Sequence, residues 1–349
     1  MGCPKGLLDA GKKSWLFCQI DAYRKAGGKY VAVILGYNAE AYKDVLPGPE
    51  TSALRGSLRI FSLMNPLPEF GPFSSVQAGC RFFLDKGFEK IAFAAVDRPL
   101  PPPETWKDLA ALKAEMAYPE KNGNAGHPVF LSKEFAKKLL SLPPECTRMD
   151  VLRDEMPAAD RKTVESDFEL TGENINSPEQ WKALSERLTM LYALPEIIAV
   201  CGEKRSGKTT KALNLVQQIK EAGLKIGGIL QPSFGDPVNP NGYDVMDAET
   251  GERKILAIKS NRAQNGCKFD FNQSAWEWAN ERILDARKNA DILVVDEIGK
   301  MEACGKGHLP ALTAPLKNES ALAWILCMRK EVADTVRPQL NFSRFSPFI

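Results

Sequence analysis

The sequence predicts an α/β protein that is made of two domains. Its 349 residues exceed the roughly 100 to 200 residues of an ordinary domain. Short apolar runs alternate with amphipathic stretches, which is typical of a mainly parallel sheet covered by helices. This alternation begins a second time at Ile197. We therefore expect one domain over residues 1–190 and a second over residues 195–349.

In the first half, buried strands and amphipathic helices follow one another. The apolar runs predict strands at residues 30–35, 58–61 and 91–96. The amphipathic stretches predict helices at residues 15–26, 74–86, 104–117, 133–140 and 178–191. The last of these helices follows Ser177, a favourable N-cap residue, and has Pro178 at its first position.

The second half repeats the α/β pattern with one irregular excursion. We expect strands at residues 197–200, 292–295 and 321–326, and helices at residues 209–222 and 277–288. The proline-rich residues 231–241 predict a turn-rich loop or hairpin. Residues 242–246 and 254–257 predict a second hairpin that turns at Thr250 and Gly251. The last residues show little pattern.

Composition excludes several functional classes. Lys and Arg total 46 against 44 Asp and Glu, and no long basic run is present, so we expect no nucleic-acid binding. No apolar run reaches the roughly 18 to 20 residues of a membrane span, and residues 1–5 lack a signal-peptide core, so we expect a cytoplasmic protein without a membrane anchor. Eight scattered cysteines without a C-x-x-C pair indicate reduced thiols. With only two histidines, catalysis must depend on carboxylates, lysines and a bound metal.

A phosphate-binding loop is the strongest chemical signal. It fits the pattern G-x-x-x-x-G-K-[ST] between a strand and a helix, and its residues are Gly202, Glu203, Lys204, Arg205, Ser206, Gly207, Lys208 and Thr209, followed by Thr210. Main-chain N–H groups and the helix N-terminus attract a phosphate, Lys208 reaches the β and γ phosphates, and the Thr209 hydroxyl is suited to Mg²⁺. The loop predicts binding of ATP, GTP or another nucleoside triphosphate.

Two adjacent carboxylates end the predicted strand at 292–295. In proteins with such a loop, an Asp at a strand end holds the Mg²⁺ shell and a neighbouring Glu polarises the attacking water. Asp296 and Glu297 fit these two roles. The alternative is a strand that simply ends in solvated acids.

The run Asp296-Glu297-Ile298-Gly299-Lys300-Met301-Glu302 resembles the D-E-I-G-K-M-E signature of the cancer-related nucleoside-triphosphatase family. The resemblance covers about residues 195–337 and implies a P-loop NTPase fold with a mainly parallel sheet, and slow hydrolysis with broad base specificity. Where the family carries an arginine-containing, glycine-rich stretch, this chain has the proline-rich residues 231–241. Lys300 and Glu302 either orient the acidic pair or start a helix. Arg329 either faces the phosphates or lies at the surface.

The first half resembles the MobA-like molybdenum-cofactor nucleotidyltransferases. An ordered set of motifs carries this resemblance: residues 1–8, Asn65-Pro66, residues 71–76, Asp97-Arg98-Pro99, residues 126–129 and residues 174–179. The resemblance implies that Lys5 offsets triphosphate charge and that Asp97 and Asn176 hold Mg²⁺. It also implies molybdopterin, or a molybdenum enzyme, as a partner.

That family begins with an apolar strand and a glycine-rich loop ahead of the stretch matched by residues 1–8. We therefore expect a Rossmann-like nucleotidyltransferase fold that lacks its first strand, with weak or absent transferase activity. Three functions stay open: a triphosphatase fused to a nucleotidyltransferase domain, a nucleotide-switched accessory protein in molybdenum-cofactor maturation, and a MobB-like GTP-binding adapter, against which the D-E-I-G-K-M-E run argues.

Overall fold

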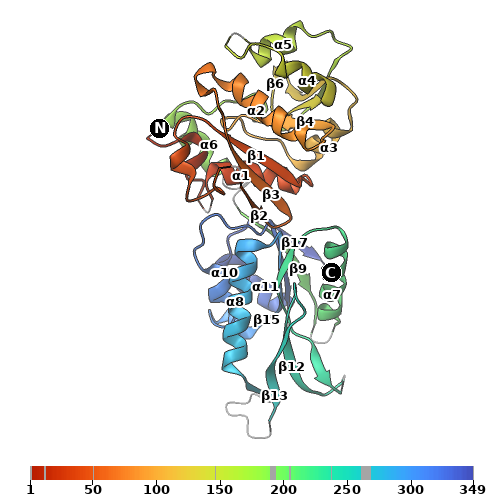
Figure 1. The fold of residues 1–349 in the computed structure, drawn as a ribbon. Helices are drawn as coiled ribbons and strands as arrows, with labels where there is room; N and C mark the ends of the chain where they lie inside the picture. Colours follow the sequence, from red (N-terminus) through yellow and green to blue (C-terminus); the bar gives the residue numbers. More distant parts are fainter. Residues whose placement is uncertain are drawn as a thin grey trace. The chain divides into compact units, whose positions relative to one another are not determined.

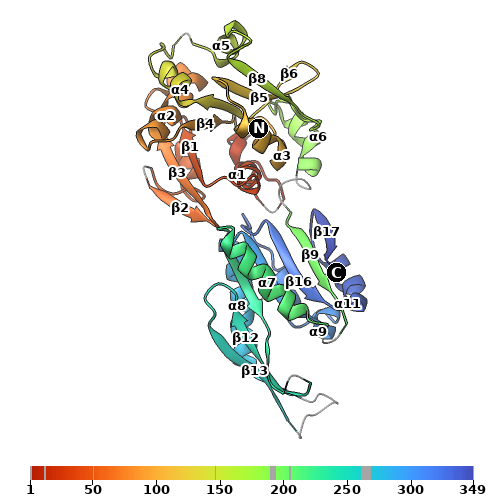
Figure 2. The ribbon, with the colours of Figure 1, turned by 90° about the vertical axis from the view of Figure 1, so that its right-hand side faces the viewer.

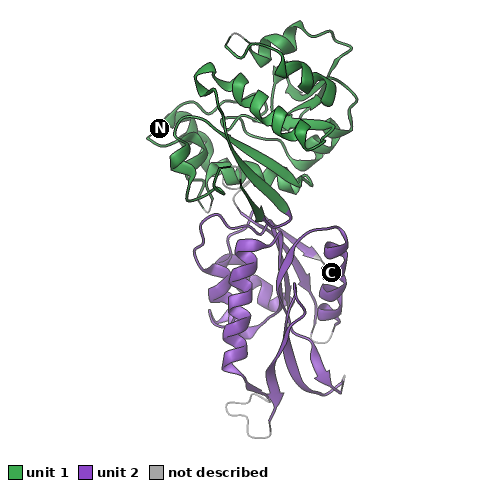
Figure 3. Cartoon of the chain, viewed as in Figure 1, with its two compact units in different colours: residues 1–54, 58–188 green, residues 55–57, 189–349 purple. Residues whose placement is uncertain are grey.

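The computed structural model describes residues 2–11, 13–49, 51–145, 147–188, 194–203, 206–236, 238–260 and 269–348. The chain divides into two compact units (Figure 3): residues 1–54 with 58–188 form unit 1, and residues 55–57 with 189–349 form unit 2. No helix in these described ranges combines the length and the apolar character that a membrane crossing requires.

Unit 1 contains two separate sheets with helices around them (Figure 1). The first sheet has the order β1-β3-β2, and the second has the order β4-β7-β5-β6 with β8 beside β5. The strands are β1 (Tyr30–Leu35), β2 (Ser52–Arg55), β3 (Leu58–Met64), β4 (Lys90–Phe93), β5 (Met116–Lys121), β6 (Asn124–Ala125), β7 (Val129–Ser132) and β8 (Arg161–Glu165). The helices are η1 (Lys5–Leu7), α1 (Trp15–Lys25), η2 (Ala39–Tyr42), η3 (Pro68–Phe70), α2 (Pro72–Asp85), α3 (Pro103–Ala111), α4 (Lys133–Leu140), α5 (Met149–Glu155) and α6 (Pro178–Leu188).

The prediction of a mainly parallel sheet is wrong for the second of these sheets. β1 pairs with β3 in parallel, and β5 pairs with β8 in parallel. However, β7 pairs with both β4 and β5 in antiparallel fashion, and β6 is also antiparallel to β5. The apolar runs predicted burial correctly but carry no information on strand direction, which depends on the connections.

Two predicted elements of unit 1 are too long, for reasons that lie in tertiary contacts. The helix expected at 104–117 ends at Ala111, because Met116 and Ala117 pair with Leu131 and Phe130 as part of β5. The strand expected at 91–96 ends at Phe93. The Val96 carbonyl instead accepts a hydrogen bond from the Trp15 indole at 2.6 Å. The chain therefore leaves the sheet just before Asp97.

Unit 2 is built on one mixed sheet with the order β14-β13-β12-β10-β15-β16-β9-β17, in which β11 pairs with β12. The strands are β9 (Glu196–Cys201), β10 (Ile226–Leu230), β11 (Ser233–Gly235), β12 (Pro240–Asp247), β13 (Arg253–Lys259), β14 (Phe269–Phe271), β15 (Ile292–Ile298), β16 (Ala323–Met328) and β17 (Arg344–Phe348). The helices are α7 (Lys208–Glu221), α8 (Gln273–Asn289), α9 (Lys300–Ala303), α10 (Leu309–Thr313), α11 (Lys330–Val336) and η6 (Arg337–Gln339).

The sheet of unit 2 is parallel in its larger part. β10, β15, β16, β9 and β17 are parallel neighbours, whereas β11 to β14 extend the sheet as antiparallel strands. The predicted hairpin around Thr250 and Gly251 is confirmed by the antiparallel pair β12 and β13. The terminal strand β17, which pairs with β9, was missed because its short sequence has no clear alternation.

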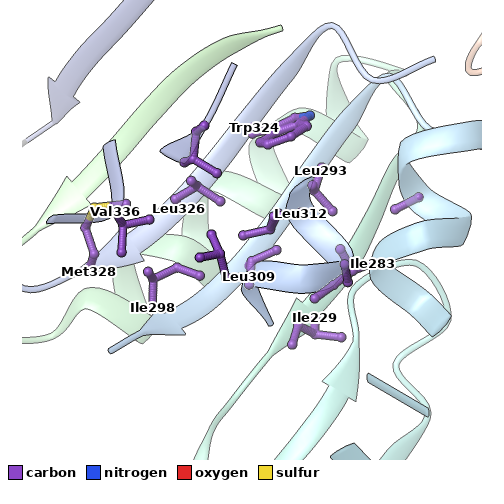
Figure 4. Packing of buried hydrophobic residues seen from close by; sticks show 14 of the residues in the cluster. Ile229, Ile283, Leu293, Ile298, Leu309, Leu312, Trp324, Leu326, Met328 and Val336 are labelled. Carbon is purple, nitrogen blue, oxygen red and sulfur yellow. The ribbon is translucent and has the colours of Figure 1, made fainter. Parts of the chain in front are cut away.

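Alternate residues of the parallel strands face two different apolar cores. Leu293, Val295 and Leu326 pack with Ile283 of α8 on one face (Figure 4). Their neighbours in sequence pack with Ala212 and Val216 of α7 on the other face. Figures 1 and 2 show α8 and α7 on opposite sides of the strands. This double coverage explains why the strands read as continuous apolar runs.

Close packing at β10 depends on two glycines. A Cβ added at Gly227 would lie 2.8 Å from the Cβ of Ala286, so this glycine lets α8 approach the strand. Gly228 has φ +104°, and a Cβ there would lie 2.1 Å from the Val294 carbonyl oxygen of β15. The pair therefore fixes the distance between β10, α8 and the strand that carries the acidic residues.

Candidate functional site

The predicted phosphate loop lies at the carboxyl end of the parallel strands. It leaves β9 at Cys201 and enters α7 at Lys208. The Gly202 N–H donates to the Met328 carbonyl at the end of β16 at 3.3 Å. β15, which carries the acidic pair, is the next strand beside β16. The sheet order thus brings the loop and the acidic pair to the same edge.

Lys208 is buried at the first position of α7 and turned into the loop. Its Nζ donates to the carbonyl oxygens of Gly202 at 3.0 Å and Glu203 at 2.7 Å. Gly207 before it has φ +83°, a left-handed conformation that glycine adopts without strain. The ammonium group therefore lies within the curl of the loop.

The structure describes some of the remaining predicted loop residues. The Ser206 N–H donates to the Glu203 carbonyl at 3.2 Å, which tightens the turn. Thr210 lies exposed in the first turn of α7. Lys204 and Arg205 lie outside the described residues.

Asp296 is completely buried and lies against the start of α7. Its Oδ2 accepts a hydrogen bond from the Gln231 N–H at 3.2 Å. The Thr209 hydroxyl and the Cys327 thiol are further hydrogen-bond partners of the carboxylate. Burial raises the pKa of Asp296, and the hydrogen bond from Thr209 opposes that shift. Among the described residues, Asp296 Oδ1 has no hydrogen-bond partner.

This donor set fits a magnesium ion. A buried carboxylate oxygen without a partner is costly, and a hydroxyl oxygen lies beside it. Mg²⁺ is commonly held by one or two such protein oxygens together with phosphate oxygens and water. Within the described ranges, no group of three or more His, Cys, Asp or Glu side chains is placed to hold a metal ion.

Glu297 differs sharply from its neighbour. It is exposed, and its backbone has φ +67°, which is rare for a residue with a side chain. The pairing of β15 with β16 shifts register between Val295 and Ile298, so a bulge interrupts the ladder at this position. Left-handed backbone of this kind concentrates at functional sites.

Glu302 starts helix α9, as one of the two alternatives for it predicted. Its Oε2 accepts from the Gly299 N–H at 2.7 Å at the beginning of α9, and its Oε1 accepts from the His308 N–H at 2.8 Å. Burial raises the pKa of Glu302, although both N–H groups oppose the shift. Lys300 is exposed, and Arg329, which is half-buried, precedes α11.

The sequence did not predict a buried polar cluster that contacts Asp296 through Gln231. The His308 ring contacts the side chains of Gln231 and Asn280 and stacks on the Trp276 ring, with centroids 4.6 Å apart. Burial lowers the pKa of His308 to about 4, so the ring is neutral at pH 7. The only available signal was that histidine is scarce in the chain.

In unit 1, the three predicted residues come together. Lys5 Nζ donates to Asp97 Oδ2 at 2.9 Å and to Asn176 Oδ1 at 2.6 Å. The Asp97 and Asn176 oxygens therefore both lie within hydrogen-bond distance of the Lys5 ammonium group. A carboxylate and an amide oxygen of this kind also suit a divalent cation that is shared with phosphate oxygens.

The segment that carries Asn176 is held by a helix cap and by the Asp97 main chain. Gln180 Oε1 accepts from the N–H groups of Asn176 at 2.7 Å and Ser177 at 3.0 Å, and the Gln180 N–H donates to Ser177 Oγ at 3.2 Å. This is a capping box at the start of α6. The Ile175 N–H donates to the Asp97 carbonyl at 2.8 Å, so the two site residues are coupled through the backbone.

A large cavity opens beside these residues. It has a volume of about 1320 Å³ and is lined by Lys5 and Asp97 together with residues of β1 and β4. These two strands are the end strands of their respective sheets. The cavity is large enough for a nucleotide and an acceptor group.

Two family models match the two halves of the chain. A family model described as NTPase matches residues 197–345, and one described as MobA-like NTP transferase domain matches residues 1–161. A nucleotidyl transferase from Methanothermobacter thermautotrophicus aligns in structure with a TM-score of 0.42 and 18% identity, over 53% of this chain and 84% of that one.

Two archaeal relatives are named nucleoside-triphosphatase THEP1. The protein of Methanocaldococcus jannaschii is 29% identical over 126 residues, which cover 36% of this chain and 74% of that protein. The protein of Pyrococcus abyssi is 30% identical over 149 residues, which cover 42% of this chain and 82% of that protein. The chain therefore belongs to the THEP1 nucleoside-triphosphatase family and carries a MobA-like NTP transferase domain ahead of its NTPase domain.

Proposed function

We propose that unit 2 hydrolyses nucleoside triphosphates with a magnesium ion held by Thr209 and Asp296. The observation that carries this proposal is the unpartnered, buried Oδ1 of Asp296 beside the Thr209 hydroxyl, at the start of the helix that follows the phosphate loop. When bound, Mg²⁺ would neutralise charge on the β and γ phosphates. The other roles in the reaction belong to side chains and amides of the chain.

The loop and Lys208 bind the triphosphate. The main-chain N–H groups of Gly207, Lys208 and Thr209, at the N-terminus of α7, favour an anion at this position. Lys208 Nζ, which donates to two loop carbonyls, exchanges these partners for the β and γ phosphate oxygens. Lys204 and Arg205 belong to the same loop motif and add positive charge to it.

Glu297 acts as the general base. Its exposure leaves the carboxylate accessible to water, and its left-handed backbone sets its side chain apart from that of the buried Asp296. The carboxylate accepts the proton of the water that attacks the γ phosphorus. Phosphate release from ATP, GTP, CTP and UTP, with and without Mg²⁺, tests this activity.

The outcome of that assay distinguishes a nucleoside-triphosphatase from a protein that only binds nucleotide. Metal-dependent release of phosphate from several triphosphates supports hydrolysis with broad base specificity. Tight binding of one nucleotide without phosphate release would instead indicate a nucleotide-switched accessory protein or a MobB-like GTP adapter.

For unit 1 we propose weak nucleotidyl transfer, below that of the MobA-like family, at the cluster of Lys5, Asp97 and Asn176. The oxygens of Asp97 and Asn176 are suited to hold Mg²⁺ between nucleotide and acceptor, and Lys5 offsets phosphate charge. Molybdopterin is the acceptor that the MobA-like resemblance implies. Transfer from CTP or GTP to molybdopterin, compared between the wild type and Asp97→Asn, tests this role. Transfer by Asp97→Asn at the wild-type rate refutes it.

A further inference from the structure

The His308 ring has a defined protonation pattern in the interior of unit 2. Gln231 Nε2 lies 3.0 Å from His308 Nε2, and only the Gln231 amide has a hydrogen to donate in this contact. His308 Nδ1 lies 2.7 Å from Asn280 Oδ1 and so must carry the ring hydrogen. The neutral tautomer protonated at Nδ1 satisfies both neighbours, and the flat stack on Trp276 fixes the ring plane.

The first connection runs from this ring to Asp296. The His308 ring holds the side chain of Gln231, and the main-chain N–H of the same Gln231 donates to Asp296 Oδ2 at 3.2 Å. Gln231 follows directly after β10, beside β15. The orientation of the Asp296 carboxylate therefore depends on where Gln231 is held.

The second connection runs from the His308 main chain to the turn after Glu297. The His308 N–H donates to Glu302 Oε1, and Glu302 Oε2 accepts from the Gly299 N–H. A Cβ added at Gly307, which has φ +65°, would lie 2.0 Å from Glu302 Oε1. Only glycine at this position lets the backbone before His308 approach the Glu302 carboxylate so closely.

We propose that His308 is a positioning residue that fixes both members of the acidic pair: its ring orients Asp296 through Gln231, and its main chain orients the turn after Glu297 through Glu302. This inference rests on the proposed hydrolysis at Asp296 and Glu297. His308 itself is buried and has no role toward the nucleotide. Its effect is therefore on turnover and on metal binding, and not on the affinity of the phosphate loop for the nucleotide.

Three substitutions of His308 distinguish the effect of losing a hydrogen bond from the effect of losing the packing of the ring. In His308→Gln the side-chain carbonyl reaches the place of Nε2 and accepts from Gln231. In His308→Asn the shorter amide reaches only the place of Nδ1 and keeps the contact with Asn280. His308→Phe keeps the stack on Trp276 and loses both hydrogen bonds.

We expect His308→Gln to retain kcat to within about threefold of the wild type, because the link to Asp296 is preserved. We expect His308→Asn and His308→Phe to lower kcat by about tenfold or more and to raise the Mg²⁺ concentration at half-maximal rate, with little change in KM. Wild-type kcat and Mg²⁺ dependence in the folded Asn and Phe variants would overturn the proposal.

A second variant keeps the proposal testable if those variants do not fold. Gln231→Leu removes only the side-chain link and should lower kcat in the same way, whereas the control Gln217→Leu on the exposed face of α7 should not. Wild-type turnover in Gln231→Leu would overturn the proposal. A fully active Glu297→Gln refutes hydrolysis by this site, whereas an inactive Glu297→Gln beside a fully active His308→Phe refutes only the positioning role.

Discussion

Asp296 and Glu297 are adjacent in sequence but lie in opposite environments. Asp296 is completely buried in β15, whereas Glu297 is exposed with a left-handed backbone at φ +67°. The bulge between Val295 and Ile298 produces this separation. One carboxylate is thereby shielded beside Thr209, and the other is open to water. Two chemically similar side chains are suited to different tasks because their surroundings differ.

Removing the Lys208 ammonium should weaken nucleotide binding. A charge-assisted hydrogen bond contributes about 1.5 to 3 kcal/mol, so Lys208→Ala should lower the affinity for a non-hydrolysable triphosphate by about tenfold or more. Lys211→Ala, on an exposed position of the same helix, is the matched control. Isothermal titration calorimetry measures both. Equal affinity in Lys208→Ala and the wild type contradicts the role of this lysine.

A buried ion pair should dominate the local stability of unit 2. Arg287 Nε lies 2.9 Å from Glu319 Oε1, both side chains are inaccessible to solvent, and Arg287 also donates to the carbonyls of Ala311 and Ala314. Glu319→Ala leaves the guanidinium without its carboxylate and should lower the free energy of unfolding by about 3 to 5 kcal/mol.

The half-exposed pair of Lys225 and Glu249 provides the contrast to this buried pair. Glu249→Ala should cost less than about 1 kcal/mol. Hydrogen exchange of peptides from α8 measures the loss in each variant. Similar losses in the two variants would show that the burial of the Arg287 pair has no special effect.

The pH dependence of stability should carry a contribution from His308. Burial lowers its pKa from 6.5 to about 4 in the folded state, so the unfolded chain takes up this proton at a higher pH. The contribution is fully present above about pH 6.5 and is lost progressively as the pH falls toward 4. The shift corresponds to about 3 kcal/mol.

The difference between wild type and His308→Gln isolates this contribution, because all other titrating groups are shared. The free energy of opening of β15 and β16, from hydrogen exchange corrected for intrinsic rates, should fall more steeply between pH 6.5 and 4 in the wild type. Parallel profiles for the two proteins would mean that His308 is not buried as a neutral ring.

Lys5 should compete with a divalent cation for the oxygens of Asp97 and Asn176. Its ammonium lies within 3 Å of both oxygens, so Lys5→Ala should increase the affinity for Mn²⁺ without nucleotide by severalfold, since a unit charge at about 4 Å contributes about 1 kcal/mol even in water. Asp97→Asn should reduce that affinity.

Electron paramagnetic resonance counts bound Mn²⁺, with Asp296→Asn as the background that removes the ligand proposed for unit 2. Asp108→Asn, at an exposed position of α3, is the control for the loss of one negative charge. Unchanged Mn²⁺ affinity in both Lys5→Ala and Asp97→Asn would mean that this cluster is only an ion pair.

Local patterns predicted the parts of both sites that lie in continuous motifs. Gly202 to Thr209 is one uninterrupted motif, and the apolar run before Asp296 places the acidic pair at a strand end. The sequence placed Lys5, Asp97 and Asn176 in one site only through a family resemblance, and the structure brings them within hydrogen-bond distance.

The residues that were missed depend on long-range contacts. Gln231 and His308 are 77 positions apart, and neither belongs to a periodic pattern. The turn-rich loop or hairpin expected at 231–241 is a hairpin in which β11 pairs with the start of β12, but the burial of Gln231 just before it was not predicted. Likewise, Met116 joins a strand because Leu131 lies opposite it, which no local propensity reveals.

Single-turnover hydrolysis by Glu297→Gln tests the central claim most directly. With enzyme in excess over a radiolabelled triphosphate and Mg²⁺ present, the variant should bind the nucleotide with wild-type affinity and release phosphate about 10² to 10⁴ times more slowly, because only the base is lost. Phosphate release at the wild-type rate from a fully bound complex would contradict the account.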